Sequence, residues 1–433
     1  MEIIMPSLER DLNDTRGYYE SGKTKEASWR ESQLKGLRRF LIEKQEDIMN
    51  ALMHDLGKHQ LEAFRDEIGT LIKTLNLALK SLKHWMSGKK AALPQLALLT
   101  SAEIVPEPLG VVLIISSWNF PFGISLEPLI GAVAAGNAAV LKPSELSPAC
   151  SSLLASNLST YLDNKAIKVI QGGPKETQQL LEQRWDKIFF TGSAHVGKIV
   201  MSAAVKHLTP VTLELGGKSC IAIDYVLVEK VYCFKLVELM KVWIKKMFGE
   251  NPQQSKTIAK IVNKHHFSRL KNLLADKKPT ILVDPPLEAA IMSEEIFGPL
   301  LPIITVEKIE DSIKFINSRP KPLALYVFTK NQTLQRRMIS ETSSGSVTIN
   351  DAILQYAVDT VPFGGVGESG FGMYHGKFSF DTFSHQKAIV RRSFLTDFWY
   401  RYPPWTLNKL QLLEVSYNYD YLGLLLVLLG LKR

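Results

Sequence analysis

The sequence predicts an α/β protein with two doubly wound parallel-sheet domains and a smaller arm. Two observations support this fold class. From residue 104 onward, apolar runs typical of buried strands alternate with helical patterns, as strands and crossover helices do in parallel sheets. Several of these strands also end in polar residues or glycines, and open α/β sheets bind ligands where their strands end.

The region before this alternation, residues 7–84, is expected to be helical. Leu34, Leu37 and Leu41 fall close to helical spacing, with charged residues between them. Nothing in this region indicates chemistry. Residues 86–103 combine lysines, a proline and short apolar runs, which predicts an extended arm or hairpin that pairs with another part of the protein.

The first α/β domain is expected to alternate strands and helices regularly. Strands are predicted at residues 110–115, 138–141, 167–170, 188–190 and 211–215, and helices at residues 126–135, 148–162, 175–184 and 199–206. The first of these strands is apolar on both faces, which is typical of a buried strand in a parallel sheet.

A second α/β domain follows. Its helices are predicted at residues 230–247, 265–276, 310–317 and 334–341, and its strands at residues 280–283, 301–306, 323–328 and 346–350. The glycine-rich loop from Pro362 to Gly370 has too few apolar residues for a core. A tight surface crossing and a functional loop are both open interpretations of it.

Charge and cysteine usage narrow the class of protein. The net charge of +9 raises the question of nucleic acid, but the charges are spread along the chain without a basic and aromatic patch. Three cysteines, Cys150, Cys220 and Cys233, indicate a reducing compartment rather than a disulfide framework, and no spacing suggests zinc.

Targeting signals are not expected, because the N-terminus lacks a long apolar core. A cytoplasmic location is predicted, with an endomembrane such as the endoplasmic reticulum as the alternative. The apolar run from Tyr421 to Leu431 is about half of the roughly 20 residues that a transmembrane helix needs. Peripheral membrane contact and packing against a partner subunit are both open for this tail.

Polar residues at successive strand ends form the candidate site. Trp118 and Asn119 offer an amide donor, Lys142 and Glu145 offer groups for ribose hydroxyls, and Glu214 offers a base. All of these strand ends would face one crevice. The sequence therefore predicts a binding and catalytic site at this edge of the first sheet.

A turn and a thiol complete this site. The turn from Gly192 through Ser193 to Gly197 leads into a helix N-terminus, which suits a pyrophosphate. Cys220 follows Glu214 by six residues. A carboxylate that reaches a thiol is the minimum equipment for thiolate catalysis with a general base. A lone cysteine is more often a small buried hydrophobe, so that interpretation stays open.

The ordered motifs resemble the aldehyde dehydrogenase superfamily. They are SWNFP, VLKPSE, FTGS with VGK, LELGGK, EEIFGP, and PFGGVGESG followed by YHGKFSFDTFSH. The resemblance runs from about residue 10 to about residue 405. Details such as KPSELS, KPLALYVF and RYPP are similar to class 3, the branch that includes fatty aldehyde dehydrogenases and plant stress-related forms.

The resemblance implies a role at each matching position. Cys220 would be the nucleophile that forms a thiohemiacetal and then a thioester. Asn119 would hold the oxyanion, and Glu214 would activate the water that hydrolyses the thioester. The cofactor, NAD or NADP, would be bound by Trp118, Lys142, Glu145, Gly192, Ser193, Gly197, Glu295 and Phe297.

The resemblance also implies an organisation and a substrate class. Medium-chain, long-chain or aromatic aldehydes would be oxidised by a homodimer that binds no nucleic acid. The implied NAD(P)-binding domain is residues 1–85 and 104–217, the catalytic domain is 218–390, and the arm and tail are 86–103 and 391–433.

The sequence departs from the family at two places. In the family, a strand–helix segment follows LELGGKS and leads to the nucleophile, whereas Cys220 here follows Ser219 directly. A second shortening occurs at residues 277–280. Because catalytic groups must be held to within about 0.5 Å by their surroundings, the alternative is a catalytically impaired isoform that binds NAD(P) or pairs with an intact family member.

Overall fold

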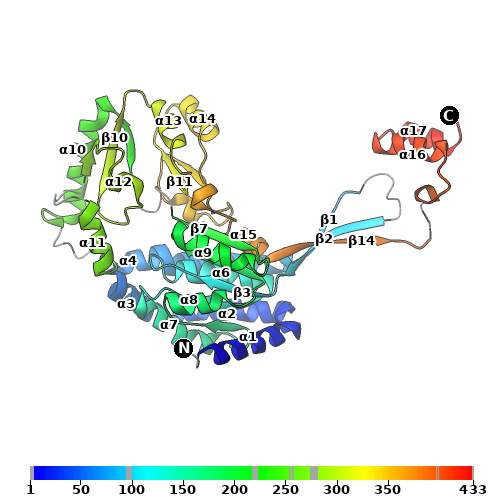
Figure 1. Cartoon of the computed structure of the whole chain (residues 1–433), viewed down its shortest axis with the longest axis horizontal. Coiled ribbons are helices and arrows are strands. Elements are labelled where there is room, and N and C mark those ends of the chain that lie inside the picture. Colours follow the sequence, from blue (N-terminus) through cyan, green and yellow to red (C-terminus); the bar gives the residue numbers. More distant parts are fainter. Residues whose placement is uncertain are drawn as a thin grey trace. The chain divides into compact units, whose positions relative to one another are not determined.

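The computed structural model describes residues 4–93, 100–216, 223–252, 255, 258–273, 281–395, 397 and 399–431. The chain forms two compact units, shown in colours that follow the sequence in Figure 1. The larger unit is Met1–Lys83 with Pro108–Ser384, and the smaller is His84–Glu107 with His385–Arg433. The further division of the larger unit into cofactor and catalytic domains stays a prediction.

The larger unit begins with helices, as the apolar spacing predicted. Leu34, Leu37 and Leu41 lie on one helix face and are almost completely buried. The helices are α1 (Ile4–Glu20), α2 (Ala27–Glu43), α3 (Gln45–Leu56), α4 (Gln60–Ala63) and α5 (Gly69–Met86), with a π-helical turn, η2 (Phe64–Ile68), before α5.

A six-stranded sheet follows, and it contains all five strands predicted for the first domain. The strands are β3 (Val111–Ile115), β4 (Ala138–Lys142), β5 (Ile167–Val169), β6 (Lys187–Gly192), β7 (Val211–Leu215) and β13 (Gly370–Phe371). Their order is β13-β7-β6-β3-β4-β5, and all neighbours are parallel except β13, which runs antiparallel to β7. Every residue of β3 and β4 is buried, which explains their uniformly apolar sequences.

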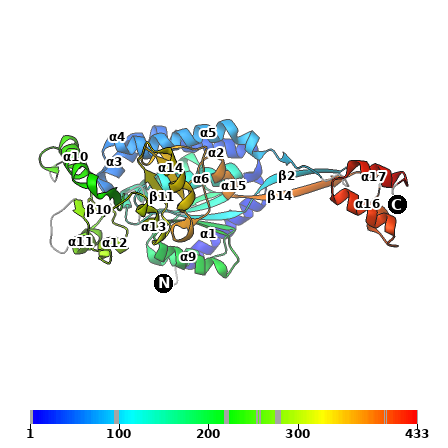
Figure 2. The same ribbon diagram turned by 90° about the horizontal axis from the view of Figure 1, so that it is seen from above.

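Helices cover both faces of this sheet, as right-handed crossovers require. Figure 2 shows α6 on one side of the strands and α9 on the other. The predicted helix at 199–206 begins earlier than expected, because the Ser193 side chain caps the first turn of α9. The helices are α6 (Gly123–Ala135), α7 (Pro148–Tyr161), α8 (Pro174–Leu181), α9 (Ala194–Val205) and α15 (Lys377–Thr382).

The predicted second α/β region is present, which confirms the fold class, but its described strands form two separate parallel sheets. One has the order β8-β10-β9, and the other pairs β11 with β12. The strands are β8 (Val226–Glu229), β9 (Ile281–Val283), β10 (Leu301–Val306), β11 (Ala324–Val327) and β12 (Ser346–Ile349). The helices are α10 (Lys230–Phe248), α11 (Lys264–Leu273), α12 (Ala290–Ser293), α13 (Asp311–Asn317) and α14 (Gln332–Glu341).

The smaller unit contains the predicted hairpin. Strand β1 (Lys89–Lys90) pairs antiparallel with β2 (Thr100–Pro108), which also neighbours β14 (Ser384–Arg392). Helices α16 (Leu407–Tyr417) and α17 (Tyr421–Leu428) follow, so the apolar tail is a short helix. Of the helices within the described residues, none has the length and apolar character needed to cross a membrane.

Candidate active site

Glu214 lies at the carboxyl end of β7, where the sequence placed a general base. Only 4% of the residue is exposed, and neither carboxyl oxygen has a hydrogen-bond partner among the described residues. Burial raises the pKa of this carboxyl well above its usual range, because the charged form loses its hydration. A buried carboxyl group with a raised pKa binds a proton more readily than an exposed one, which suits a group that has to take a proton from water.

The glycine-rich loop lies directly against this carboxyl group. Gly370 pairs with Glu214 across β13 and β7, and a Cβ on Gly370 would overlap the backbone oxygen of Leu213. A Cβ on Gly364 would lie 3.2 Å from Glu214 Oε1. The glycines therefore allow the loop backbone to pack close to the candidate base, whereas a loop that only crossed the surface would not contact it.

Asn119 lies in the loop that follows β3. The Ser117 hydroxyl donates to Asn119 Oδ1 at 2.7 Å, so the amide oxygen is the end that accepts. The Nδ2 group is then the end that can donate to an oxyanion. The role of Asn119 at an oxyanion stays a prediction.

Trp118 and Phe297 come together from loops far apart in the sequence. Their ring centroids are 5.6 Å apart, and the Trp118 ring also lies 5.5 Å from that of His266. Phe297 has a φ of 46°, in the left-handed region that non-glycine residues rarely adopt. A conformation of this kind persists only where the surroundings hold it.

Two polar residues hold the loop that carries Glu295 and Phe297. Arg269 donates to the backbone oxygens of Glu295 at 2.9 Å and Ile296 at 2.7 Å, and Asp224 accepts from the Ile296 backbone nitrogen at 2.8 Å. A Cβ on Gly216 would overlap Glu295 Oε2, so this carboxylate lies against the backbone just after Glu214.

Lys142, the last residue of β4, and Glu145 also come together. Lys142 Nζ donates to Glu145 Oε2 at 2.8 Å. The lysine side chain is 4% exposed and the glutamate side chain 40% exposed, so the pair reaches from the sheet end to the surface. A buried cation and an accessible carboxylate at one strand end are suited to hydroxyl groups such as those of a ribose.

The turn after β6 has the form of an anion site. Ser193 Oγ accepts from the Val196 backbone nitrogen at 3.3 Å at the start of α9. Gly197 packs so closely on β7 that a Cβ there would lie 2.6 Å from Leu215 Cδ2. Gly192 accepts a hydrogen bond at its backbone oxygen from Gly216 at 3.2 Å. The helix N-terminus and small residues fit a pyrophosphate.

Cys220, the predicted nucleophile, lies outside the described residues. The two other cysteines, Cys150 and Cys233, are free thiols and are both buried. Burial raises the pKa of each thiol, which makes the reactive thiolate harder to form. Neither has the environment of an activated nucleophile.

The helical N-terminal region contributes a support that sequence reasoning missed. Glu67 Oε2 accepts from the backbone nitrogens of Phe122 at 2.8 Å and Gly123 at 3.1 Å, at the start of α6. Lys58 Nζ donates to Glu67 Oε1 at 2.6 Å and lies 3.9 Å from the centre of the Phe120 ring. This buried ion pair fixes the loop that presents Asn119. Glu67 follows Arg65 and Asp66 directly, so the sequence gives no local signal for this contact.

Known proteins match this chain along its length. The model of the aldehyde dehydrogenase family matches residues 12–226 and 277–389. Aldehyde dehydrogenase family 3 member F1 of Arabidopsis thaliana is 47% identical over 484 positions that cover 100% of both chains. Aldehyde dehydrogenase family 3 member A2 of Rattus norvegicus is 44% identical over 88% of both chains.

A solved structure shows the same fold. The substrate-bound state of Staphylococcus aureus AldH has a TM-score of 0.90 and 38% identity, and the match covers 97% of this chain and 99% of that one. A glyceraldehyde-3-phosphate dehydrogenase from Methanocaldococcus jannaschii, complexed with NADP, has a TM-score of 0.78 at 23% identity, over 90% of this chain and 95% of that one.

The alignment with member F1 also shows that this chain is shorter than the aligned region. The alignment with member F1 has 484 positions and this chain has 433 residues, a difference of 51. The similarity nevertheless covers the whole chain and does not favour the alternative of a catalytically impaired isoform. The motifs, the fold and these matches agree, and the chain belongs to the aldehyde dehydrogenase family.

Proposed function

We propose that this protein oxidises medium-chain, long-chain or aromatic aldehydes to carboxylic acids with NAD or NADP. Family membership supports the reaction class. The single observation that carries the proposal is Glu214, which is buried, has a raised pKa and lies at the end of β7. Of the proposed cofactor residues, Trp118, Lys142 and Ser193 lie at or just after the ends of β3, β4 and β6 of the same sheet, whereas Glu295 and Phe297 lie in the loop before β10.

The residues at these strand ends fit a dinucleotide. The N-terminus of α9 offers backbone N–H groups to the pyrophosphate, and the Lys142–Glu145 pair offers a donor and an acceptor to ribose hydroxyls. Trp118, Glu295 and Phe297 would bind the nicotinamide end. Bound NAD or NADP supplies the acceptor for the hydride that leaves the aldehyde carbon.

The remaining chemistry belongs to three side chains. The Cys220 thiolate attacks the aldehyde carbon, and Asn119 Nδ2 donates to the oxyanion that forms. After oxidation, the acyl group is held on Cys220 as a thioester. Glu214 takes a proton from water, the resulting hydroxide adds to the thioester carbon, and the cysteine thiolate leaves as the acid is released.

The test is NADH formation by the purified full chain with hexanal, alongside NAD binding by calorimetry. Cys220→Ala should abolish turnover and leave NAD binding intact, while Cys233→Ala should keep activity. Glu214→Gln should slow steady-state turnover by about 10²- to 10⁴-fold, the usual range for a general base. Turnover that survives Cys220→Ala would show that another group is the nucleophile.

We also propose a homodimer that forms through the smaller unit, in a cytoplasmic protein. Trp405 and Leu407 in this unit are 69% and 76% exposed, which leaves apolar surface for a partner subunit. Light scattering should give about twice the chain mass of 48.6 kDa. Peripheral membrane contact of the tail is the other proposal for this surface, and sedimentation with liposomes would detect it.

A further inference from the structure

Helices α6 and α7 begin without a side-chain cap of their own. The N-cap residue of α6, Phe122, has no polar side-chain atom, and the side chain of Ser147, the N-cap residue of α7, makes no capping hydrogen bond. In α9, by contrast, the Ser193 side chain accepts from the first turn. The first backbone N–H groups of a helix have no partner within the helix, so α6 and α7 need acceptors from elsewhere.

One short segment of the N-terminal helical region supplies both acceptors. Glu67, in the π-helical turn η2, accepts from two backbone nitrogens at the start of α6, at 2.8 and 3.1 Å. Asp55, in the last turn of α3, accepts from the backbone nitrogens of Ala149 and Cys150 in the first turn of α7, at 3.2 and 2.9 Å. The two carboxylates therefore take the place of the missing caps.

Both carboxylates are buried, so these hydrogen bonds form away from water. The Asp55 side chain is 1% exposed and that of Glu67 is 0% exposed. Lys58 Nζ also donates to Glu67 at 2.6 Å. Hydrogen bonds from backbone N–H groups to a charged carboxylate are stronger than neutral ones, and the positive end of the helix dipole adds to them. Loss of either carboxylate should therefore release the start of one helix.

The two capped helices follow loops with different proposed roles. The loop between β3 and α6 carries Asn119, which would donate to the oxyanion. The end of β4 and the loop between β4 and α7 carry Lys142 and Glu145, which would bind the ribose. Because each loop ends where its helix begins, the carboxylate that caps the helix also fixes one end of the loop.

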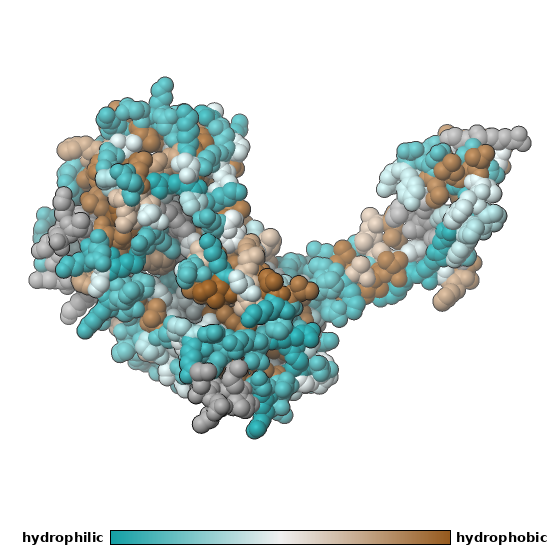
Figure 3. Space-filling view, in the orientation of Figure 1, coloured by the Kyte–Doolittle hydropathy of each residue, from teal (hydrophilic) through white to brown (hydrophobic). Residues whose placement is uncertain are grey.

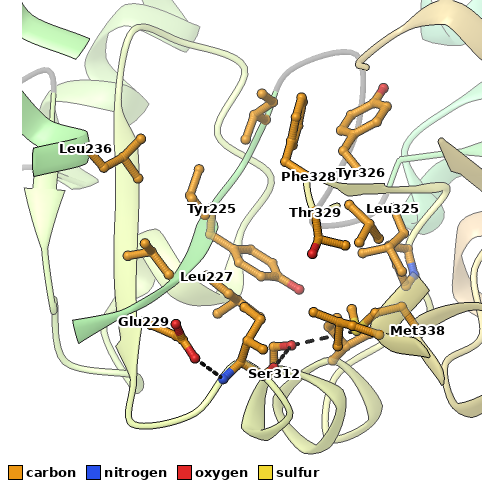
Figure 4. Close-up of a pocket in the computed structure, with 18 of the residues that line it drawn as sticks. Tyr225, Leu227, Glu229, Leu236, Ser312, Leu325, Tyr326, Phe328, Thr329 and Met338 are labelled. Atoms are coloured by element: carbon orange, nitrogen blue, oxygen red, sulfur yellow. Dashed lines mark hydrogen bonds between the residues drawn. The ribbon is translucent and has the colours of Figure 1, made fainter. Parts of the chain in front are cut away.

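The large apolar groove of the second α/β region is separate from this support. It lies between β8 and β11 and has a volume of about 710 Å³. Figure 4 shows Leu227 of β8 on one side of the groove and Leu325 of β11 on the other. Helix α10 adds apolar residues to the lining, and Figure 3 shows brown, hydrophobic residues among hydrophilic ones in the region where Figure 1 places α10. The lining includes neither Asp55 nor Glu67, and none of the site residues that the structure describes.

We propose that Asp55 and Glu67 are positioning residues that act on different steps of the reaction. Glu67 holds the Asn119 amide in place and thereby sets the rate of NADH formation from bound aldehyde. Asp55 holds the Lys142–Glu145 pair in place and thereby sets the affinity for the cofactor. This inference rests on the proposed aldehyde oxidation, and it adds two residues that act through loops rather than by contact with a ligand.

The test compares Glu67→Gln and Asp55→Asn in the full chain, because each amide has nearly the shape of the side chain that it replaces. With hexanal, Glu67→Gln should slow NADH formation in a single turnover by about 10- to 100-fold and leave NAD affinity, measured by calorimetry, within about twofold. Asp55→Asn should weaken NAD binding at least about tenfold, and saturating NAD should restore its single-turnover rate. Glu26→Gln, in an exposed pair with Lys23, should change neither quantity.

Hydrogen exchange adds a measurement that needs no turnover. Glu67→Gln should speed exchange at the start of α6 alone, and Asp55→Asn at the start of α7 alone. A parent chain that forms no NADH would contradict the proposed oxidation itself. With an active parent, variants that both slow turnover and weaken NAD binding to the same extent, or that leave both unchanged, would overturn the separate positioning roles. So would exchange that rises equally in α6 and α7 in each variant.

Discussion

The six-stranded sheet and the pair of small sheets differ in how completely their strands are paired. In the first, β3, β4, β6 and β7 each have a neighbour on both sides. In the second, the described strands β8 and β11 each have one neighbour and an apolar groove between them. Both regions use parallel strands and crossover helices, so the difference lies in pairing rather than in fold class.

This difference in strand pairing bears on where the residues of the candidate site lie. The residues proposed to bind the cofactor and the general base lie at the ends of strands that are fully paired and buried, or against them. The sequence predicts that the departure from the family falls between β7 and β8, and this stays a prediction. Strands with a neighbour on both sides hold the residues at their ends in place. A strand with one neighbour leaves apolar surface uncovered.

Core truncation should give the largest contrast between the two regions. Phe189 of β6 is fully buried, with ring centroids 5.2 Å from Tyr374 and 5.9 Å from Phe383. Phe189→Ala should lower the free energy of unfolding by about 3–5 kcal/mol. Leu325→Ala at the groove should lower it by about 1 kcal/mol, because Leu325 is only partly buried. Denaturant titration measures both, and similar losses would contradict the contrast.

The buried pair under the Asn119 loop should have a somewhat smaller effect. Glu67→Ala leaves Lys58 and two backbone N–H groups without their acceptor, so the free energy of unfolding should fall by about 3 kcal/mol. The isosteric Glu67→Gln should recover part of this loss. Glu26→Ala breaks an exposed pair with Lys23 and should change little. A Glu67→Ala chain as stable as the parent would show that the pair does not hold the loop.

The pH dependence of stability provides a further contrast, and it arises in the first region. Burial, with the nearby charge of Asp359, raises the pKa of Glu127 in α6 from 4.5 to about 8. The folded state thus binds the proton more tightly than the unfolded chain. The resulting stability is present below about pH 4.5 and is lost as pH rises to about 8.

Glu127→Gln tests this assignment, because the amide does not titrate. The melting temperature of the variant relative to the parent should rise between pH 5 and pH 8. Parallel melting curves for both proteins across this range would show that Glu127 does not titrate there.

Much of the fold could be predicted because the apolar patterns are strong. The buried strand at 110–115 begins one residue later than predicted, and the strand at 211–215 has the predicted bounds. Several site residues could also be placed, since Lys142 and Glu214 follow directly from where strands end.

The remaining features depend on contacts between distant segments. Neither the Glu67 contact with the start of α6 nor the approach of Trp118 to Phe297 follows from local spacing. The division of the second region into two sheets also could not be predicted, because each of its strands has an ordinary strand pattern. An unpaired edge is a property of the neighbours, not of the strand itself.

Native-state hydrogen exchange of the full chain tests the contrast between the two regions most directly. The amides of β3 have partners on both sides, so they should all exchange slowly, at the free energy of global unfolding. Strand β8, whose one neighbour among the described residues is β10, should contain amides that exchange rapidly beside protected ones. Uniform slow exchange through β8, equal to that of β3, would contradict the contrast between the two regions.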